Sequence, residues 1–304
     1  MDAFAALVAA TLNAGTPILL ASLGLLINER CGVVNLGAEG MMLIAAIAGF
    51  AVGFHSGSVL LGLLAGMLAG ASLAALFGAL AIGLVTNQYA TGLAITLFGA
   101  GLSAFIGLPY VGAALPAAPA AGLPWLEDLP WLGPALFSLH PMVYVAWMLT
   151  ALAAYVLART RIGLVMRAVG ESPESAHAIG LQVRWIRFAA VAAGGACCGL
   201  GGAYLSLVYT PLWSEGMVAG RGWIALALTT FATWRPWRVA LGAYLFGSVT
   251  MIQLYLQAAG VQIASQLLSM LPYAATIVVL VLISWRPQFL RLNVPASLGK
   301  PFHP

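Results

Sequence analysis

The sequence contains very little charge. Only 7% of its 304 residues are Asp, Glu, Lys or Arg, and 62% are hydrophobic, whereas a soluble globular domain has about 25% charged residues. Charge is completely absent from residues 3–28, 40–126, 129–158, 188–214 and 239–285. Because one helix needs only about 20 apolar residues to cross a bilayer, several of these stretches hold more than one crossing. The composition excludes an ordinary soluble domain and predicts an all-α polytopic membrane protein.

Motifs for catalysis and metal binding are absent as well. The single lysine, Lys300, is followed by proline, so the phosphate-binding motif G-x-x-x-x-G-K-[ST] does not occur. Neither H-E-x-x-H nor G-x-S-x-G is present, the four histidines are scattered singly, and the three cysteines have no ligand or disulfide spacing. We therefore expect no catalytic residue, no metal site and no cofactor in this chain.

Turn residues and polar breaks divide the apolar stretches into about nine membrane crossings. The expected helices are 5–27, 40–54, 58–85, 90–111, 139–158, 188–209, 222–233 (short), 239–258 and 266–285. With the N-terminus outside, eleven of the twelve Lys and Arg residues fall on the cytoplasmic side and only Arg221 lies outside, as the positive-inside rule requires. We expect one membrane domain, residues 1–304, with its N-terminus outside and its C-terminus inside.

Two connections between the expected helices are long. The outer connection, residues 112–138, is rich in Pro, Ala, Gly and Trp, which fits an interfacial loop better than a dedicated partner surface. The inner connection, residues 159–187, contains signals for a short, separately capped helix. Ser172 suits an N-cap, Pro173 suits the first helical position, and Gly180 suits the C-terminal end. This helix is either an ordinary loop turn or a rigid peg for a soluble partner, and the missing nucleotide site favours the peg.

Three segments carry a resemblance to a known family: "ERCGVVNLGAEGMMLIAA" (29–46), "RAVGESPESAHAIGLQV" (167–183) and "GRGWIALALTTFATWRPWR" (220–238). Together they resemble the permease subunits of bacterial binding-protein-dependent ABC importers, in the nucleoside and simple-sugar branch related to branched-chain amino-acid permeases. The resemblance implies a coupling helix that sits on a separate cytoplasmic ATPase subunit, which would bind the ATP and Mg²⁺. The residues of this coupling segment are Glu171, Ser172, Pro173, Glu174, Ser175, Ala176, His177, Ala178, Ile179 and Gly180. We expect Ala176 to lie on the face that docks against the partner.

Candidate pathway residues come first from the segment "GVVNLGAEG". Topology places residues 28–40 on the cytoplasmic side or re-entering from it, and the glycines permit a broken helix surrounded by protein or water. Asn35 and Glu39 would then face the interior of the bundle. Since an ionisable residue within a membrane segment is costly, Glu39 is either a pathway or gate residue, or a structural helix cap paired with an arginine. Glu29 and Arg30 are expected to be interfacial charges.

Two further polar clusters interrupt the apolar runs. Asn87 and Gln88 in "TNQYAT" (86–91) belong to a simple turn or to a broken-helix gate. Trp213 and Glu215 in "YTPLWSEGMVAGRGW" (209–223) lie on the outer side and are also candidates for the pathway or gate.

Glycine stripes predict where helices cross closely. One stripe consists of Gly62, Gly66 and Gly70, and another of Gly195 and Gly199. Small residues at this spacing let two helix backbones approach each other within a membrane.

The first functional hypothesis is a multi-pass permease subunit in a bacterial inner membrane, forming half of the pathway of an ABC importer. Its partners would be the ATPase, a second permease subunit, which the family branch suggests is a distinct homologue, and a periplasmic or lipoprotein solute-binding protein. The resemblance favours a nucleoside, and a sugar or a branched-chain amino acid is the alternative solute. An ion-coupled secondary transporter, with Glu39 or Glu215 as its coupling carboxylate, is the competing class, and a membrane enzyme is disfavoured.

Overall fold

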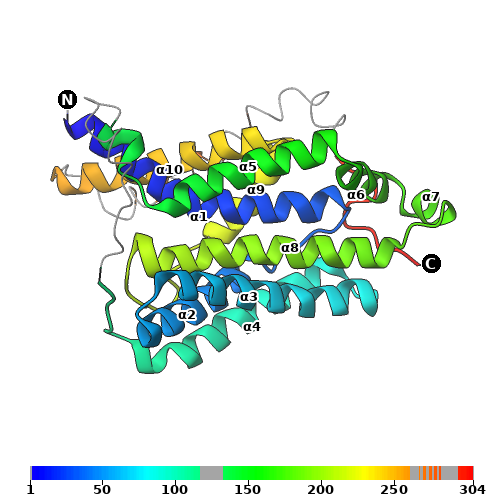
Figure 1. Cartoon of the computed structure of the whole chain (residues 1–304), viewed down its shortest axis with the longest axis horizontal. Coiled ribbons are helices and arrows are strands. Elements are labelled where there is room, and N and C mark those ends of the chain that lie inside the picture. The colour runs from blue at the N-terminus through cyan, green and yellow to red at the C-terminus, as the bar shows by residue number, and fades with distance from the viewer. Residues whose placement is uncertain are drawn as a thin grey trace.

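The computed structural model describes residues 2–116 and 133–260, scattered positions between 267 and 281, and residues 294–303. These residues form long helices, most of them roughly parallel to the long axis of the molecule (Figure 1). The α-helices are α1 (Asp2–Arg30), α2 (Ala38–Ser56), α3 (Val59–Gly78), α4 (Gln88–Gly107), α5 (Pro141–Arg159), α6 (Arg161–Glu171), α7 (Pro173–Ala178), α8 (Val183–Tyr204), α9 (Arg221–Phe231) and α10 (Pro236–Ala258). π-Helical turns extend α3 through η1 (Ala79–Gly83) and α8 through η4 (Leu205–Tyr209), and a third, η3 (Gly133–Phe137), precedes α5; η2 (Leu108–Tyr110) is a 3₁₀ turn after α4.

Within the described residues, 7 helices are long and apolar enough to cross a membrane. They correspond to seven of the nine expected crossings. The eighth, expected at 222–233, is α9, which has only 11 residues. The ninth, expected at 266–285, falls largely outside the described residues, as does most of the outer connection. The all-helical membrane architecture is confirmed, whereas the count of nine crossings is not.

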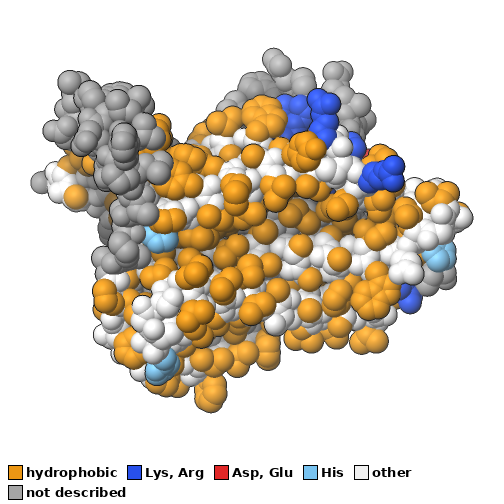
Figure 2. Space-filling view, in the orientation of Figure 1, with side chains coloured by type: hydrophobic (Ala, Val, Ile, Leu, Met, Phe, Trp, Pro, Cys, Tyr) orange, Lys and Arg blue, Asp and Glu red, His pale blue; other side chains and the backbone are white. Residues whose placement is uncertain are grey.

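Helices α1 and α8 lie side by side in the middle of the bundle (Figure 1). On one side of them lie α2, α3 and α4, and on the other lie α5 and α10. The N-terminus is at one end of the long axis, and α6, α7 and the C-terminus are at the other (Figure 1). Figure 2 shows hydrophobic side chains over most of this face, with its Lys and Arg side chains toward the end that carries α6 and α7.

The predicted glycine stripes meet between α3 and α8. A Cβ atom at Gly70 would lie 2.4 Å from the Gly195 carbonyl oxygen and 2.6 Å from the Gly199 Cα. A Cβ at Gly66 would likewise lie 2.4 Å from the Cβ of Ala203. Only glycine fits at such a backbone contact, so the predicted close crossing is confirmed.

Candidate solute pathway and partner-docking helix

The connection between α1 and α2 is a turn buried inside the bundle. Its residues 31–37 are buried except for the half-buried Leu36. The Asn35 Oδ1 accepts the Gly37 N–H at 2.9 Å, and its Nδ2 lies 3.6 Å from the Met41 Sδ. Asn35 thus shapes the turn that starts α2, in agreement with the predicted break in the helix. Non-helical backbone of this kind is tolerated within a membrane only where protein or water surrounds it.

Glu39, in the first turn of α2, binds the start of α9. Its Oε1 accepts the Gly220 N–H at 2.8 Å, and its Oε2 accepts the Gly222 N–H at 2.7 Å. The carboxylate is 8% exposed and satisfies two of the backbone donors that a helix N-terminus leaves free. The nearby Arg221 donates instead to the carbonyls of Met217 and Val218. Of the two interpretations of Glu39, the geometry agrees with a helix cap; Arg221 attracts the carboxylate electrostatically, while its described hydrogen bonds go to backbone carbonyls.

Glu29 and Arg30, both expected to be interfacial charges, contact the segment around Trp234. Glu29 is 3% exposed; its carboxylate accepts the Thr229 hydroxyl at 3.0 Å and the Trp234 indole N–H at 2.5 Å. The half-buried Arg30 donates to the Trp234 carbonyl at 2.8 Å. The expectation of interfacial charges was wrong for Glu29, because its partners come from a segment about 200 residues away in the sequence.

The two glutamates therefore hold opposite ends of α9. At 1.5 Å per residue, this helix is about 16 Å long, or half of the roughly 30 Å hydrocarbon core. Glu39 binds its N-terminal end, and Glu29 binds the segment around its C-terminal end. A half-length helix whose N-terminus points into the bundle is typical of solute pathways in transporters.

Asn87 and Gln88 make hydrogen bonds within the fold. The Asn87 Oδ1 accepts the N–H groups of Tyr89 and Ala90 at 3.0 and 3.1 Å and so caps α4. The buried Gln88 accepts the Val34 N–H at 2.9 Å and holds the α1–α2 turn in place. These contacts agree with the turn interpretation, and a gate role for either residue stays a prediction.

Trp213 and Glu215 lie in different environments. Trp213 is 2% exposed and packs with Ala46, Ile47 and Phe50 of α2. Glu215 is exposed. Within the described residues, the polar contacts of Asn35 and Glu39 do not include Trp213 or Glu215. The four candidate pathway residues therefore do not form one polar cluster there.

A polar cavity of about 330 Å³ lies near the N-terminal half of α1, away from α7. Its lining includes Asn13 of α1, His140 at the start of α5, Tyr204 of α8 and Tyr209 of η4. The Tyr204 hydroxyl donates to the Asn13 Oδ1 at 2.8 Å. The Arg221 guanidinium lies 5.8 Å from the centre of the Tyr209 ring, within the range of a cation–π contact.

The imidazole of His140 supplies a donor to this cavity. Its Nδ1 accepts the Met142 N–H at 3.2 Å, and burial lowers the pKa of His140. The neutral ring therefore carries its proton on Nε2. None of the candidate pathway residues expected from the sequence lines this cavity. Two signals could have pointed to it: Asn13, a polar residue within the charge-free run 3–28, and Tyr209 at the start of the polar cluster 209–223.

The inner connection folds largely as predicted. Ser172 accepts the Ser175 N–H at 3.2 Å as the N-cap of α7, Pro173 is its first residue, and Gly180 follows with a φ of 88°. The helix projects at the end of the molecule (Figure 1). Ile179, directly after α7, is 76% exposed.

Ala176 was expected on an exposed docking face, and this expectation was wrong. It is 3% exposed and packs with Val169, Val183 and Phe302. The exposed residues of the segment are instead Glu171, Glu174, Ser175, His177, Ala178, Ile179 and Gly180.

The C-terminal tail, residues 294–303, ties α7 to the α1–α2 turn. The buried Arg187 of α8 donates to the Cys31 carbonyl at 3.1 Å, the Ser297 Oγ at 3.0 Å and the Lys300 carbonyl at 3.2 Å. The Gly299 N–H donates to the Gly32 carbonyl at 3.1 Å. Burial also raises the pKa of the Cys31 thiol to about 12, so this cysteine is an inert part of the core.

Comparison with known proteins agrees with this arrangement. The family model described as the permease component of branched-chain amino acid transport systems matches residues 7–283. The chain belongs to this permease family. Among its relatives, a putative glucose ABC transporter permease of Haloferax volcanii is 41% identical over 98% of this chain and 97% of the relative. A nucleoside ABC transporter permease of Lactococcus lactis is 32% identical over 91% of each chain.

A guanosine ABC transporter permease of Bacillus subtilis is 32% identical to the present chain over 79% of each sequence. No solved structure matches the present chain. As a member of this family, the permease is a multi-pass membrane component of an ABC transporter rather than an enzyme.

Proposed function

We propose that the permease forms half of the membrane pathway of an ABC importer for a solute with a hydroxylated ring, and that this solute is a nucleoside. Its partners would be a cytoplasmic ATPase that binds ATP and Mg²⁺, a second and homologous permease subunit, and an external solute-binding protein. The bacterial inner membrane, with the N-terminus outside and the C-terminus inside, is the proposed setting.

The observation that carries the solute proposal is the polar cavity. Its volume of about 330 Å³ lies within the range of small-molecule sites, which combine apolar walls with a few fixed polar groups. Asn13 and His140 offer hydrogen-bonding groups for hydroxyls, and the half-buried ring of Tyr209 offers aromatic surface for a base. By the predicted topology this cavity faces the outer side, where a binding protein would release its solute.

A sugar is the second candidate, and one observation favours it. The relative with 41% identity over nearly the whole chain is named as a putative glucose permease, whereas the two nucleoside relatives are 32% identical. Hydroxyl-binding groups in the cavity suit the ribose of a nucleoside and a hexose alike.

Uptake of labelled guanosine, uridine and glucose by a deletion strain carrying the permease and its neighbouring transporter genes tests both candidates. Tyr204→Phe removes the buried hydroxyl that orients the Asn13 side chain in the cavity, and the weakened hydrogen bond from Asn13 to the solute is expected to raise the KM for uptake about three- to tenfold. Tyr155→Phe on the exposed surface of α5 is the matched control and should leave the KM unchanged. Equal KM values for the Tyr204 variant and wild type would refute the assignment of the cavity.

We further propose that residues 171–180 couple the permease to the ATPase. The proposal is supported by the cap, proline and terminal glycine of α7 and by its projecting position. Ala176 is buried, whereas Ile179 is exposed and accessible to a docked partner. Ile179→Glu should abolish stimulation of ATPase activity by the loaded binding protein while leaving the expression level unchanged.

The matched control for this test is Leu164→Glu, at an exposed position of α6. Full stimulation and normal uptake in the Ile179 variant would show that the segment is not the coupling element. Solute specificity is read from KM values and coupling from ATPase stimulation, so the two proposals can fail separately.

A further inference from the structure

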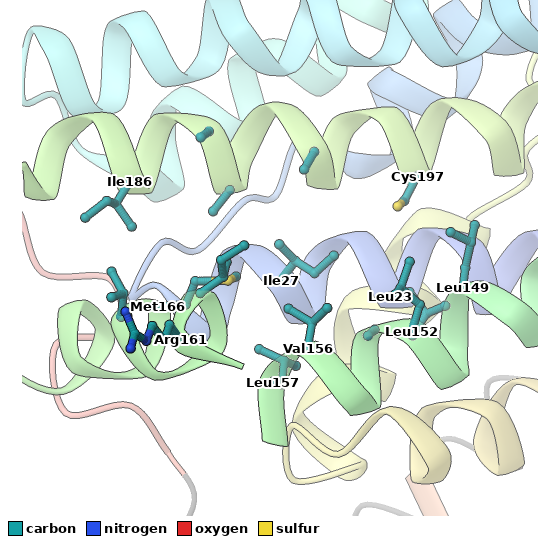
Figure 3. Close-up of a pocket in the computed structure, with 16 residues that line it drawn as sticks. Leu23, Ile27, Leu149, Leu152, Val156, Leu157, Arg161, Met166, Ile186 and Cys197 are labelled. Atoms are coloured by element: carbon teal, nitrogen blue, oxygen red, sulfur yellow. The ribbon is translucent and has the colours of Figure 1, made fainter. Parts of the chain in front are cut away.

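A long apolar groove lies between α8 on one side and α1 and α5 on the other. Its volume is about 580 Å³, and Figure 3 shows it running from Arg161 and Ile186 at one end to Cys197 and Leu149 at the other. Alanine residues of α8, Ala189 among them, line one wall and leave the groove open. This groove is separate from the polar cavity and from the exposed face of α7.

Among the described residues, Arg161 is the only charged one that lines the groove. It is exposed at the first position of α6, and the described part of the chain gives it no hydrogen bond or ion pair. A cation that has no partner within the described ranges, at the end of a groove with apolar walls, is complementary to an amphiphile with an anionic head. By the predicted topology, Arg161 lies on the cytoplasmic side, where anionic lipids attract basic residues.

The length of the groove identifies the kind of amphiphile. Along α8 it extends from Ile186 to Cys197, which is about 16 Å at 1.5 Å per residue. One leaflet contributes about 15 Å to the hydrocarbon core. A lipid of the cytoplasmic leaflet with its phosphate at Arg161 would therefore reach the far end of the groove with one acyl chain.

We propose that this groove is a binding site for one anionic phospholipid, whose phosphate pairs with Arg161 and whose acyl chain fills the space between α5 and α8. The lipid would act as a spacer that holds α5 and α6 at a fixed distance from the centre of the bundle. This proposal rests on the predicted orientation but not on the identity of the solute or of the coupling element.

The test titrates the full-length chain, purified in a mild detergent, with phosphatidylglycerol and phosphatidylcholine, and counts retained lipids by native mass spectrometry. Wild type should retain one phosphatidylglycerol about fivefold more tightly than phosphatidylcholine, as expected for one arginine at a membrane surface. Arg161→Gln should remove this preference. Ala193→Phe, which fills the groove from an exposed position of α8, should remove the tightly held lipid altogether.

Two matched controls share the local setting without lining the groove. Arg159→Gln removes a neighbouring exposed arginine, and Ala151→Phe adds the same bulk at an exposed position of α5. Both should bind lipid as wild type does. The proposal is overturned if wild type binds the two lipids equally, or if the groove variants behave like their controls. It is equally overturned if Ala193→Phe weakens association with a second copy of the chain while lipid retention stays unchanged.

Discussion

Replacing Glu39 by Gln tests whether this carboxylate holds the fold together. The change preserves the shape of the side chain, but an amide has one acceptor oxygen, whereas the carboxylate accepts the N–H groups of Gly220 and Gly222 with separate oxygens. One charge-assisted hydrogen bond is lost, at about 1.5 to 3 kcal/mol, and one buried N–H loses its acceptor, at about 1 to 3 kcal/mol. We therefore expect a loss of about 3 kcal/mol in the free energy of unfolding.

For a chain of this size, such a loss lowers the Tm by about 6 °C, at roughly 2 °C per kcal/mol. The chain contains its own reporters, because Cys31 and Cys198 are buried and free and become reactive to a thiol-sensitive dye only on unfolding. The matched control is Glu215→Gln, because Glu215 is exposed and its replacement should change stability by less than about 0.5 kcal/mol.

A Glu39 variant with the Tm of wild type would refute the cap. If that variant also showed altered solute uptake, the alternative interpretation of Glu39 as a gate would be the correct one. If it retained both stability and uptake, neither interpretation would survive.

Three more predictions follow from the same structure. Reporter fusions should place the outer connection outside and the inner connection inside, and cytoplasmic activity of a fusion at residue 120 would overturn the topology. Arg187→Gln should lower the Tm by several degrees, because three acceptors, in two buried hydrogen bonds and one part-buried one, lose a charged donor, whereas the exposed Arg184→Gln should not. Gly70→Leu should prevent the close approach of α3 and α8, at a cost of about 1 to 3 kcal/mol or more, and the same change at Gly101, which faces open space, should leave the Tm of the purified chain unchanged.

The membrane helices could be predicted well because a single physical requirement decides them. A span must be apolar for about 20 residues, and this pattern is local in the sequence. The end of α1 shows the limit of such reasoning. The helix was expected to end at residue 27 because Glu29 and Arg30 resembled surface charges, yet it continues to Arg30. Their partners around Trp234 lie about 200 residues away, and local patterns do not record such contacts.

The site could be predicted only where local chemistry specifies it. The cap of α7 was found because Ser172, Pro173 and Gly180 act on their own neighbours. The burial of Ala176 was missed because Phe302, more than a hundred residues away, covers it. The polar cavity was missed for the same reason, since Asn13 and Tyr204 meet only when α1 and α8 are packed together.

Contacts between segments that are distant in the sequence also link α7, at the end of the molecule, to Glu39, which caps α9 within the bundle. Phe302 packs against Ala176 in α7, and the same tail donates a backbone hydrogen bond from Gly299 to Gly32 in the α1–α2 turn. That turn leads directly into α2, whose first turn carries Glu39 and holds the start of α9. Each step is a direct contact or a short connection along the chain, so a displacement of α7 by a docked partner would have a continuous mechanical route to α9. The C-terminal tail, rather than the long transmembrane helices alone, completes this route.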